Sequence, residues 1–147
     1  MSKTPFVAKI RVTGRDRILR QLLVGAGVSS CNIVIHALVV RVTRAVGSEN
    51  VWYPSALFVS ILMPAHTSEV IVWSIAYATL NAGPVGADLV YFAFVNYTTL
   101  GYGDVIPVEG WRLLGPITAM NGVLFGWSTA VIFEVLQRAL LLTDMLS

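Results

Sequence analysis

Three long apolar stretches, separated by polar segments, organise the sequence. Residues 22–40 contain no Asp, Glu, Lys or Arg, residues 55–80 contain one acidic residue, and residues 113–133 are again uncharged. At about 1.5 Å per residue, each stretch can cross a hydrocarbon core of about 30 Å as a helix, the first only barely. The pattern predicts an all-α membrane protein with long helices at residues 22–40, 55–80 and 111–138.

A fourth apolar run, at residues 87–98, is too short to cross a membrane. Asn81, Gly83, Pro84 and Gly86 end the helix before it, and the run itself makes only about 18 Å of helix. Such a segment must enter and leave from the same side, which is tolerated only where protein or water surrounds its backbone. We expect a re-entrant helix whose C-terminal end points into a water-filled cavity and favours a cation there.

Composition supports the membrane interpretation. Hydrophobic residues make up 56% of the chain, charged residues 12%, and the mean hydropathy is +0.73. The charged fraction is about half that of an ordinary soluble domain. The sequence contains no phosphate-binding loop, no metal-ligand cluster and no Ser-His-Asp set. We therefore expect no enzyme and no cofactor. The single Cys31 permits no disulfide within the chain.

The first 21 residues are strongly basic and suit an anionic membrane surface. Nucleic-acid binding is not expected, because no folded basic domain accompanies this segment. The simplest interpretation is a topology signal. Its basic residues are Lys3, Lys9, Arg11, Arg15, Arg17 and Arg20, against a single Asp16.

Polar side chains on the first two predicted membrane helices are costly in hydrocarbon and therefore need partners. Asn32 and His36 lie four residues apart, and His66 and Glu69 lie three apart, so each pair shares one face of its helix. Two interpretations stay open. The four residues form an intramembrane polar cluster that ties the two helices together, or His66 and Glu69 sense protons, because histidine titrates near physiological pH.

Directly after the short run, the chain reads Thr99-Leu100-Gly101-Tyr102-Gly103-Asp104. Gly-x-Gly alone usually marks a turn. Here the glycines stand where successive carbonyl groups could be aimed into one narrow bore, which requires backbone angles that residues with a Cβ reach only at a cost.

In its order of helix, short helix, glycine motif and helix, the segment from about residue 55 to 138 resembles the pore domain of the two-transmembrane potassium-channel superfamily. The motif at residues 98–107 is similar to the selectivity filter of that family and its outer turn. Trp111 and Arg112 fall where the family begins its inner helix. The runs at residues 111–115, 120–122 and 125–130 are similar to small bacterial ion-channel proteins that carry one extra N-terminal helix.

The resemblance implies a homotetramer, in which three identical subunits join each chain and their filters together surround dehydrated K+. It implies filter carbonyls at Thr99, Leu100, Gly101, Tyr102 and Gly103, with K+ bound at the first four of these residues. Thr98, Tyr91 and Asp104 would support the filter. Gly122, at the place of the family's gating glycine, and Gly126 would serve as hinges of the inner helix.

Two departures from the family pattern lead to a specific expectation. Leu100 replaces the usual valine, and Val95 stands where some members carry a carboxylate that pairs with the filter aspartate. Asp104 therefore needs another partner. Tyr91 stands where the family often has an aromatic donor, so we predict a hydrogen bond from the Tyr91 hydroxyl to Asp104.

The expected organisation is a basic N-terminal segment at residues 1–21, a membrane helix and connector at residues 22–50, a pore domain at residues 51–138 and a short tail at residues 139–147. The pore domain divides into an outer helix at 55–80, a pore helix at 87–98, a filter at 99–104 and an inner helix at 111–138.

The charge rule places the basic N-terminus in the cytoplasm. A filter mouth that faces outward, with residues 22–40 crossing fully, would place it outside. Either the first helix crosses against the rule, which the resemblance favours, or it lies in the interface or re-enters.

The expected function is passive, potassium-selective conduction in a bacterial plasma membrane, among membrane lipids. The alternatives are a non-selective cation channel and a non-conducting membrane adaptor with a pore-like fold. No apolar helix carries arginine at every third position, so a voltage sensor is not expected.

Overall fold

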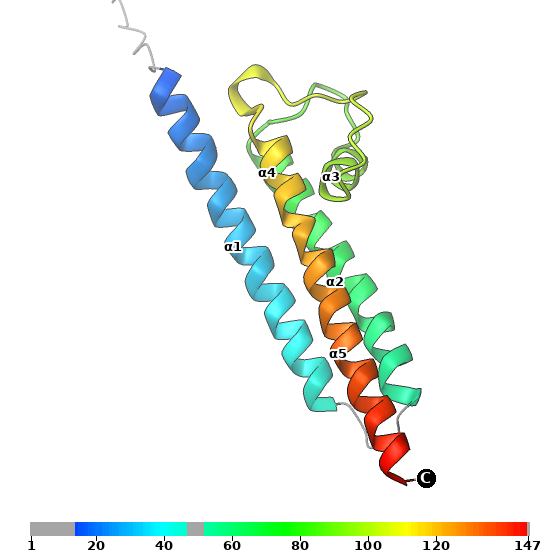
Figure 1. The fold of residues 1–147 in the computed structure, drawn as a ribbon. Coiled ribbons are helices and arrows are strands. Elements are labelled where there is room, and N and C mark those ends of the chain that lie inside the picture. The colour runs from blue at the N-terminus through cyan, green and yellow to red at the C-terminus, as the bar shows by residue number, and fades with distance from the viewer. Residues whose placement is uncertain (1–13, 47–51, 147) are drawn as a thin grey trace, which may run out of the picture.

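The chain folds into an elongated bundle of helices (Figure 1). The computed structural model describes residues 14–46 and 52–146, and within these ranges it contains no β-strand. The predicted all-α fold is confirmed. The elements in chain order are α1 (Gly14–Val46), α2 (Trp52–Thr79), α3 (Leu89–Tyr97), the 3-10 helix η1 (Glu109–Trp111), α4 (Leu114–Asn121) and α5 (Val123–Leu146).

Helix α1 has 33 residues and is longer than the predicted 22–40. At about 1.5 Å per residue it extends over about 50 Å. Its ends carry Arg15, Arg17 and Arg41, whose long side chains can reach polar surroundings while their stems cover apolar surface. Charge therefore marks the limits of the hydrocarbon segment and not the limits of the helix. The predicted boundaries at residues 21 and 41 are wrong by about one to two turns, and residues 47–51 of the connector lie outside the described residues.

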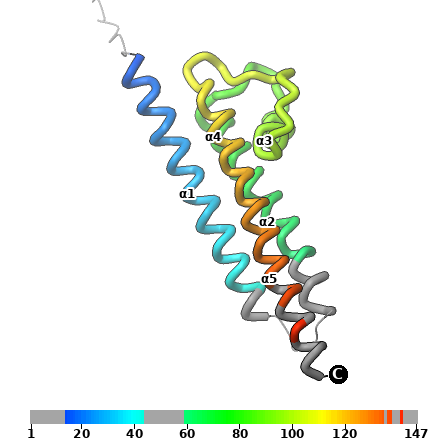
Figure 2. The backbone as a smooth tube through the Cα atoms, viewed as in Figure 1, coloured from blue at the N-terminus to red at the C-terminus, as the bar shows by residue number. Residues whose placement is uncertain are grey.

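Helix α1 runs along the whole bundle, antiparallel to α2, with its first turns beside the loop that joins α3 to α4 (Figures 1 and 2). Gln21 fixes this end, because its Oε1 accepts a hydrogen bond of 2.8 Å from the main-chain N–H of Leu113. The guanidinium of Arg20 also lies 4.5 Å from the centre of the Trp111 ring. Helix α1 is one continuous helix packed lengthwise against α2 and α4, which favours a full crossing over a re-entrant or interfacial first helix.

The predicted outer helix at 55–80 corresponds closely to α2, whereas the predicted inner helix at 111–138 is divided. Helix α4 ends at Asn121 and is capped by Gly122, whose N–H donates to the carbonyl of Ala119 at 2.9 Å. Helix α5 then continues to Leu146. Residues 139–146 are thus helical, and the segment expected as a short tail continues α5. Leu140, Leu141 and Leu142 are good helix formers and extend the preceding helix at no cost in propensity.

Three helical segments, at residues 14–43, 59–79 and 114–134, are long and apolar enough to cross a membrane. Many large apolar side chains on them are exposed, as expected where lipid covers the surface. The core that positions the remaining elements lies between α2, α3 and α4. Its fully buried side chains include Trp73, Tyr77, Phe92, Tyr97 and Leu114.

Candidate functional site

Helix α3 presents the glycine motif and begins at a side-chain cap. The Asp88 carboxylate accepts hydrogen bonds of 3.0 Å from the main-chain N–H groups of Val90 and Tyr91, which satisfies donors that the first turn leaves free. This cap explains why the helix starts at Leu89 and not at the predicted residue 87. Its C-terminal turn contains Tyr97, which is fully buried, and the motif follows at once.

The motif has an unusual backbone in which every second residue has a positive φ. The φ angles are +60° at Thr99, +56° at Gly101 and +76° at Gly103. In an extended chain successive carbonyls point to opposite sides. Left-handed angles at alternate residues turn them towards one side. Glycine reaches these angles freely, but Thr99 is β-branched and pays for its angle in strain.

The start of the motif is held by its N–H groups. Thr99 N–H bonds to the carbonyl of Asn96 at 3.0 Å, and those of Leu100 and Gly101 both bond to the carbonyl of Val95, at 3.0 and 3.2 Å. Within the described residues, no carbonyl of residues 99–103 accepts a main-chain hydrogen bond. The first three N–H groups of the motif are therefore bonded to α3, while its carbonyl groups remain available to a ligand.

The end of the motif is held by its aspartate. The Tyr91 hydroxyl donates a hydrogen bond of 2.6 Å to Asp104 Oδ2, as the sequence predicts. The other carboxylate oxygen accepts a 3.0 Å bond from the N–H of Val105. Because its hydroxyl donates to a carboxylate, the pKa of Tyr91 is raised above its ordinary value of 10.0.

Of the two glycines predicted as hinges, only Gly122 touches the motif's surroundings. A Cβ built on Gly122 would lie 2.5 Å from the carbonyl oxygen of Tyr97 and 3.5 Å from Cγ2 of Thr99. A Cβ built on Gly126 would meet nothing within 4 Å. Gly122 therefore allows the break between α4 and α5 to pack directly on the last turn of α3.

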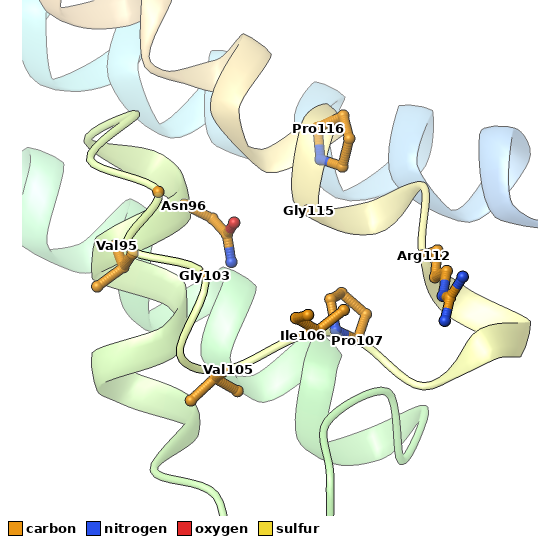
Figure 3. A pocket seen from close by; sticks show the side chains of 10 residues that line it. Val95, Asn96, Gly103, Val105, Ile106, Pro107, Arg112, Gly115 and Pro116 are labelled. Carbon is orange, nitrogen blue, oxygen red and sulfur yellow. The ribbon is translucent and has the colours of Figure 1, made fainter.

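A cavity of about 330 Å³ separates the motif from the start of α4 (Figure 3). Gly101 is among its lining residues, and Figure 3 shows Gly103 on one side of it and Arg112, Gly115 and Pro116 on the other. Side chains of the motif also point away from the chain, since Leu100 is 54% and Tyr102 67% exposed.

A family described as "Ion channel" matches residues 65–138, which is half of the chain. The match runs from the middle of α2 through the motif into α5. The chain belongs to this family of two-transmembrane pore-domain ion channels. No curated protein and no solved structure matches the chain.

In this channel α2 is the outer helix, α3 the pore helix, and α4 with α5 the inner helix. The family shows a multi-pass membrane protein that conducts ions. Helix α1 lies outside the matched residues, as an additional helix on the pore domain.

The four polar side chains predicted to form an intramembrane cluster lie together, and two further polar side chains, from α3 and α5, contact them. The polar cluster consists of Asn32, His36, His66, Glu69, Tyr97 and Ser128, contributed by α1, α2, α3 and α5, and all six are buried. Glu69 is its centre. Nδ1 of His36 lies 3.0 Å from Glu69 Oε1, and Nδ1 of His66 lies 3.1 Å from Oε2.

The added members close the polar cluster. The Tyr97 hydroxyl donates to Glu69 Oε2 and lies 3.2 Å from Nδ1 of His66. Ser128 Oγ lies 2.9 Å from Nε2 of His66 and 3.2 Å from Nε2 of His36. The predicted hydrogen bonding between the first two helices is present, whereas a role in proton sensing stays a prediction.

Asn32 has a divided environment within the polar cluster. Its Nδ2 donates to the main-chain carbonyl of Glu69 at 3.2 Å, while its Oδ1 is buried without a hydrogen-bond partner. The Phe125 ring stacks on His66 with 4.0 Å between ring centres and covers the cluster from α5.

Several contributors escaped prediction. Tyr97 lies next to the motif on an apolar helix, where a tyrosine hydroxyl alone gives no indication of its partner. Ser128 bonds to His66 within its own chain, and Asn121 similarly accepts a 2.7 Å bond from Trp73. Asp88 could have been found, since Asp before an apolar run is a typical N-cap.

Proposed function

We propose that the channel conducts K+ selectively through a filter formed by residues 99–104 of four identical chains. Stacked main-chain carbonyls can replace the water shell of a potassium ion, and this demands a ring of them at each level. One chain supplies one strand of that ring, so a homotetramer is the smallest assembly that surrounds the ion.

The observation that carries the proposal is the alternation of positive φ angles at Thr99, Gly101 and Gly103. It turns successive carbonyls to one side, and these carbonyls accept no main-chain hydrogen bond within the described residues. The exposed side chains of Leu100 and Tyr102 and the cavity behind the motif supply surfaces for neighbouring subunits.

The same arrangement suggests an orientation. If the Asp104 end of the filter faces outward, the first turns of α1 lie on that side as well, because Gln21 bonds to Leu113 beyond the filter. The proposal therefore places the N-terminus outside and all three long helices across a bacterial plasma membrane. Permeant ions are then the required ligand, and no catalytic step or cofactor is invoked.

Ion uptake into liposomes that contain the purified protein tests the proposal. We expect uptake of rubidium, a potassium substitute, and no comparable uptake of sodium. Gly101→Ala should abolish rubidium uptake, because an L-residue pays about 1–2 kcal/mol for the left-handed conformation at each of four positions. Gly110→Ala is the matched control, since a Cβ there meets nothing within 4 Å and Gly110 has no positive φ.

Each other result identifies a rival. Equal rubidium and sodium uptake would mean a non-selective cation channel, and no uptake by a fully assembled protein would mean an adaptor. Mass measurement or crosslinking in detergent should give four chains. Dimers alone would contradict the proposed pore.

A further inference from the structure

The polar cluster gathers donor atoms of the kind that bind transition metals. His36, His66 and Glu69 can each offer one ligand atom, and these atoms all lie within 4.8 Å of one another. All three side chains are buried. Imidazole nitrogen together with carboxylate oxygen is a ligand set typical of Zn²⁺, whereas Mg²⁺ and Ca²⁺ prefer oxygen ligands alone.

The spacings approach those of a tetrahedral site. With metal–ligand bonds of about 2.0–2.1 Å, neighbouring ligand atoms of a tetrahedral zinc site lie about 3.3 Å apart. In the polar cluster, Nδ1 of His66 lies 3.1 Å from Glu69 Oε2 and 3.2 Å from the Tyr97 hydroxyl oxygen, and Nδ1 of His36 lies 3.0 Å from Glu69 Oε1. The two histidines face different oxygens of Glu69, so the ligand atoms, which lie within 4.8 Å of one another, would draw together around the ion.

Ser128 contacts both histidines on the ring nitrogens that face away from Glu69. Its Oγ faces Nε2 of both histidines, at 2.9 and 3.2 Å. If both Nε2 atoms carry hydrogen and donate to Ser128, both Nδ1 atoms present lone pairs towards Glu69. A metal-bound histidine typically donates its second ring N–H to such an acceptor, which fixes its tautomer and orientation.

The charge of the polar cluster also suits a bound cation. Zn²⁺ adds two positive charges to a buried place, where uncompensated charge is costly. Glu69 supplies one negative charge next to the two histidines, and the Tyr97 hydroxyl oxygen supplies a fourth, neutral ligand atom. The carboxylate therefore offsets half of the charge of the ion.

We infer that His36, His66, Glu69 and Tyr97 form a tetrahedral binding site for Zn²⁺, with Ser128 as a positioning residue. The site joins α1 and α2 to the pore helix, at the residue two positions before Thr99. It lies apart from the proposed filter, and the inference does not depend on potassium conduction.

Absorption of Co²⁺, a spectroscopic substitute for Zn²⁺, tests the site directly. The protein carries Cys31→Ser, because Cys31 is an exposed free thiol that would bind metal by itself, and it is purified without a histidine tag. Co²⁺ added in detergent should give the intense visible bands of tetrahedral coordination and saturate at one ion per chain. Zn²⁺ should then remove the bands.

Variants test whether the absorption bands come from the proposed ligands and from Ser128. His36→Gln removes one ligand and should abolish the tetrahedral spectrum. Ser128→Ala should weaken Co²⁺ binding by about 10–100-fold, as loss of an outer hydrogen-bond partner does elsewhere. Asn32→Ala is the matched control on the same face of α1, since Asn32 bonds only to the main chain of Glu69 and should leave the spectrum unchanged.

Thermal melting of each variant separates lost binding from lost folding. Zn²⁺ should raise the melting temperature of the parent protein and of Asn32→Ala, but not that of His36→Gln. If His36→Gln does not fold, Ser128→Ala still decides the matter. The inference is overturned by the weak spectrum of hydrated Co²⁺ in the parent protein, by an unchanged spectrum in His36→Gln, or by unchanged affinity in Ser128→Ala.

Discussion

At the scale of single residues, Gly122 shows how closely the inner helix approaches the filter. A methyl group there would lie 2.5 Å from a main-chain oxygen of Tyr97, and backbone cannot rotate away as a side chain can. Thr99, two residues after Tyr97, has a positive φ of 60°. Glycine at 122 thus keeps free the space beside the last turn of α3 and the first residue of the motif.

We predict that Gly122→Ala displaces the end of the pore helix and destabilises the protein by about 1–3 kcal/mol, the usual cost of overpacking. Rubidium uptake should fall with it. Gly126→Ala, four residues further along, adds a methyl group in open space and should instead gain up to about 1 kcal/mol of helix propensity. Equal melting temperatures and uptake for the two variants would contradict this role of Gly122.

Tyr91 and Asp104 allow a second residue-scale prediction. Tyr91→Phe removes the 2.6 Å hydrogen bond, so the outer end of the filter loses a tether and uptake should decline faster during sustained flux. Asp104→Asn weakens the acceptor of the same bond and should act similarly. If the bond is the cause, the double variant should be no worse than either single one; additive effects would argue against it.

The same bond has a pH dependence whose sign follows from Tyr91. The hydroxyl donates only while protonated, and donation to Asp104 raises its pKa above 10.0. The stabilisation is therefore fully present at neutral pH and is lost as the pH rises past 10. Above that pH, the flux decline of the parent channel should approach that of Tyr91→Phe, whose own profile should lack this component.

At the scale of elements, α1 is joined to the pore domain by a close approach to α4. A Cβ on Gly25 would lie 2.7 Å from Cδ1 and 2.9 Å from Cγ2 of Ile117, whose β-branched side chain has few alternative rotamers. Small residues at such contacts let helices in membranes pack by van der Waals contact. Gly25 and the Gln21 hydrogen bond together fix the position of α1 on α4.

We predict that Gly25→Leu separates α1 from α4 and lowers stability by about 1–3 kcal/mol. Gly27→Leu is the matched control, because a Cβ at Gly27 meets nothing within 4 Å. Melting in detergent should show a lower transition for the first variant only. A similar melting temperature for both would mean that α1 does not depend on this contact.

At the scale of the whole molecule, the antiparallel placement of α1 decides the topology. Because α1 and α2 run in opposite directions along the bundle, both must cross if either does, and the N-terminal end of α1 lies beside the loop that follows the filter. Arg15, Arg17 and Arg20 at that end of α1 therefore lie on the same side of the bundle as this loop, and if this side faces outward they lie against the usual charge rule.

Thiol labelling in intact cells tests this orientation. A Ser2→Cys variant with Cys31→Ser should react with a membrane-impermeant maleimide added outside. A Cys placed at Ser147, beyond the third long helix, should react only after the cells are opened. Labelling of Ser2→Cys only after opening would reverse the proposed orientation.

Much of the fold follows from local sequence, and the contacts of the polar cluster do not. The run of apolar residues from 87 to 98 is too short to cross, so a re-entrant helix could be predicted from length alone. The break at Gly122 could not, because glycine is tolerated inside helices and only its closeness to Tyr97 distinguishes it from Gly126.

The sequence by itself determined the order of the long apolar helices and the position of the glycine motif, because apolar length and residue spacing act locally. The family resemblance added the bond between Tyr91 and Asp104. Tertiary structure decided where α1 lies and which polar side chains meet. His36, Glu69, Tyr97 and Ser128 come from four helices, and only packing brings them within hydrogen-bond distance of one another. Buried polar groups must find partners, but chain order does not specify which partners these are.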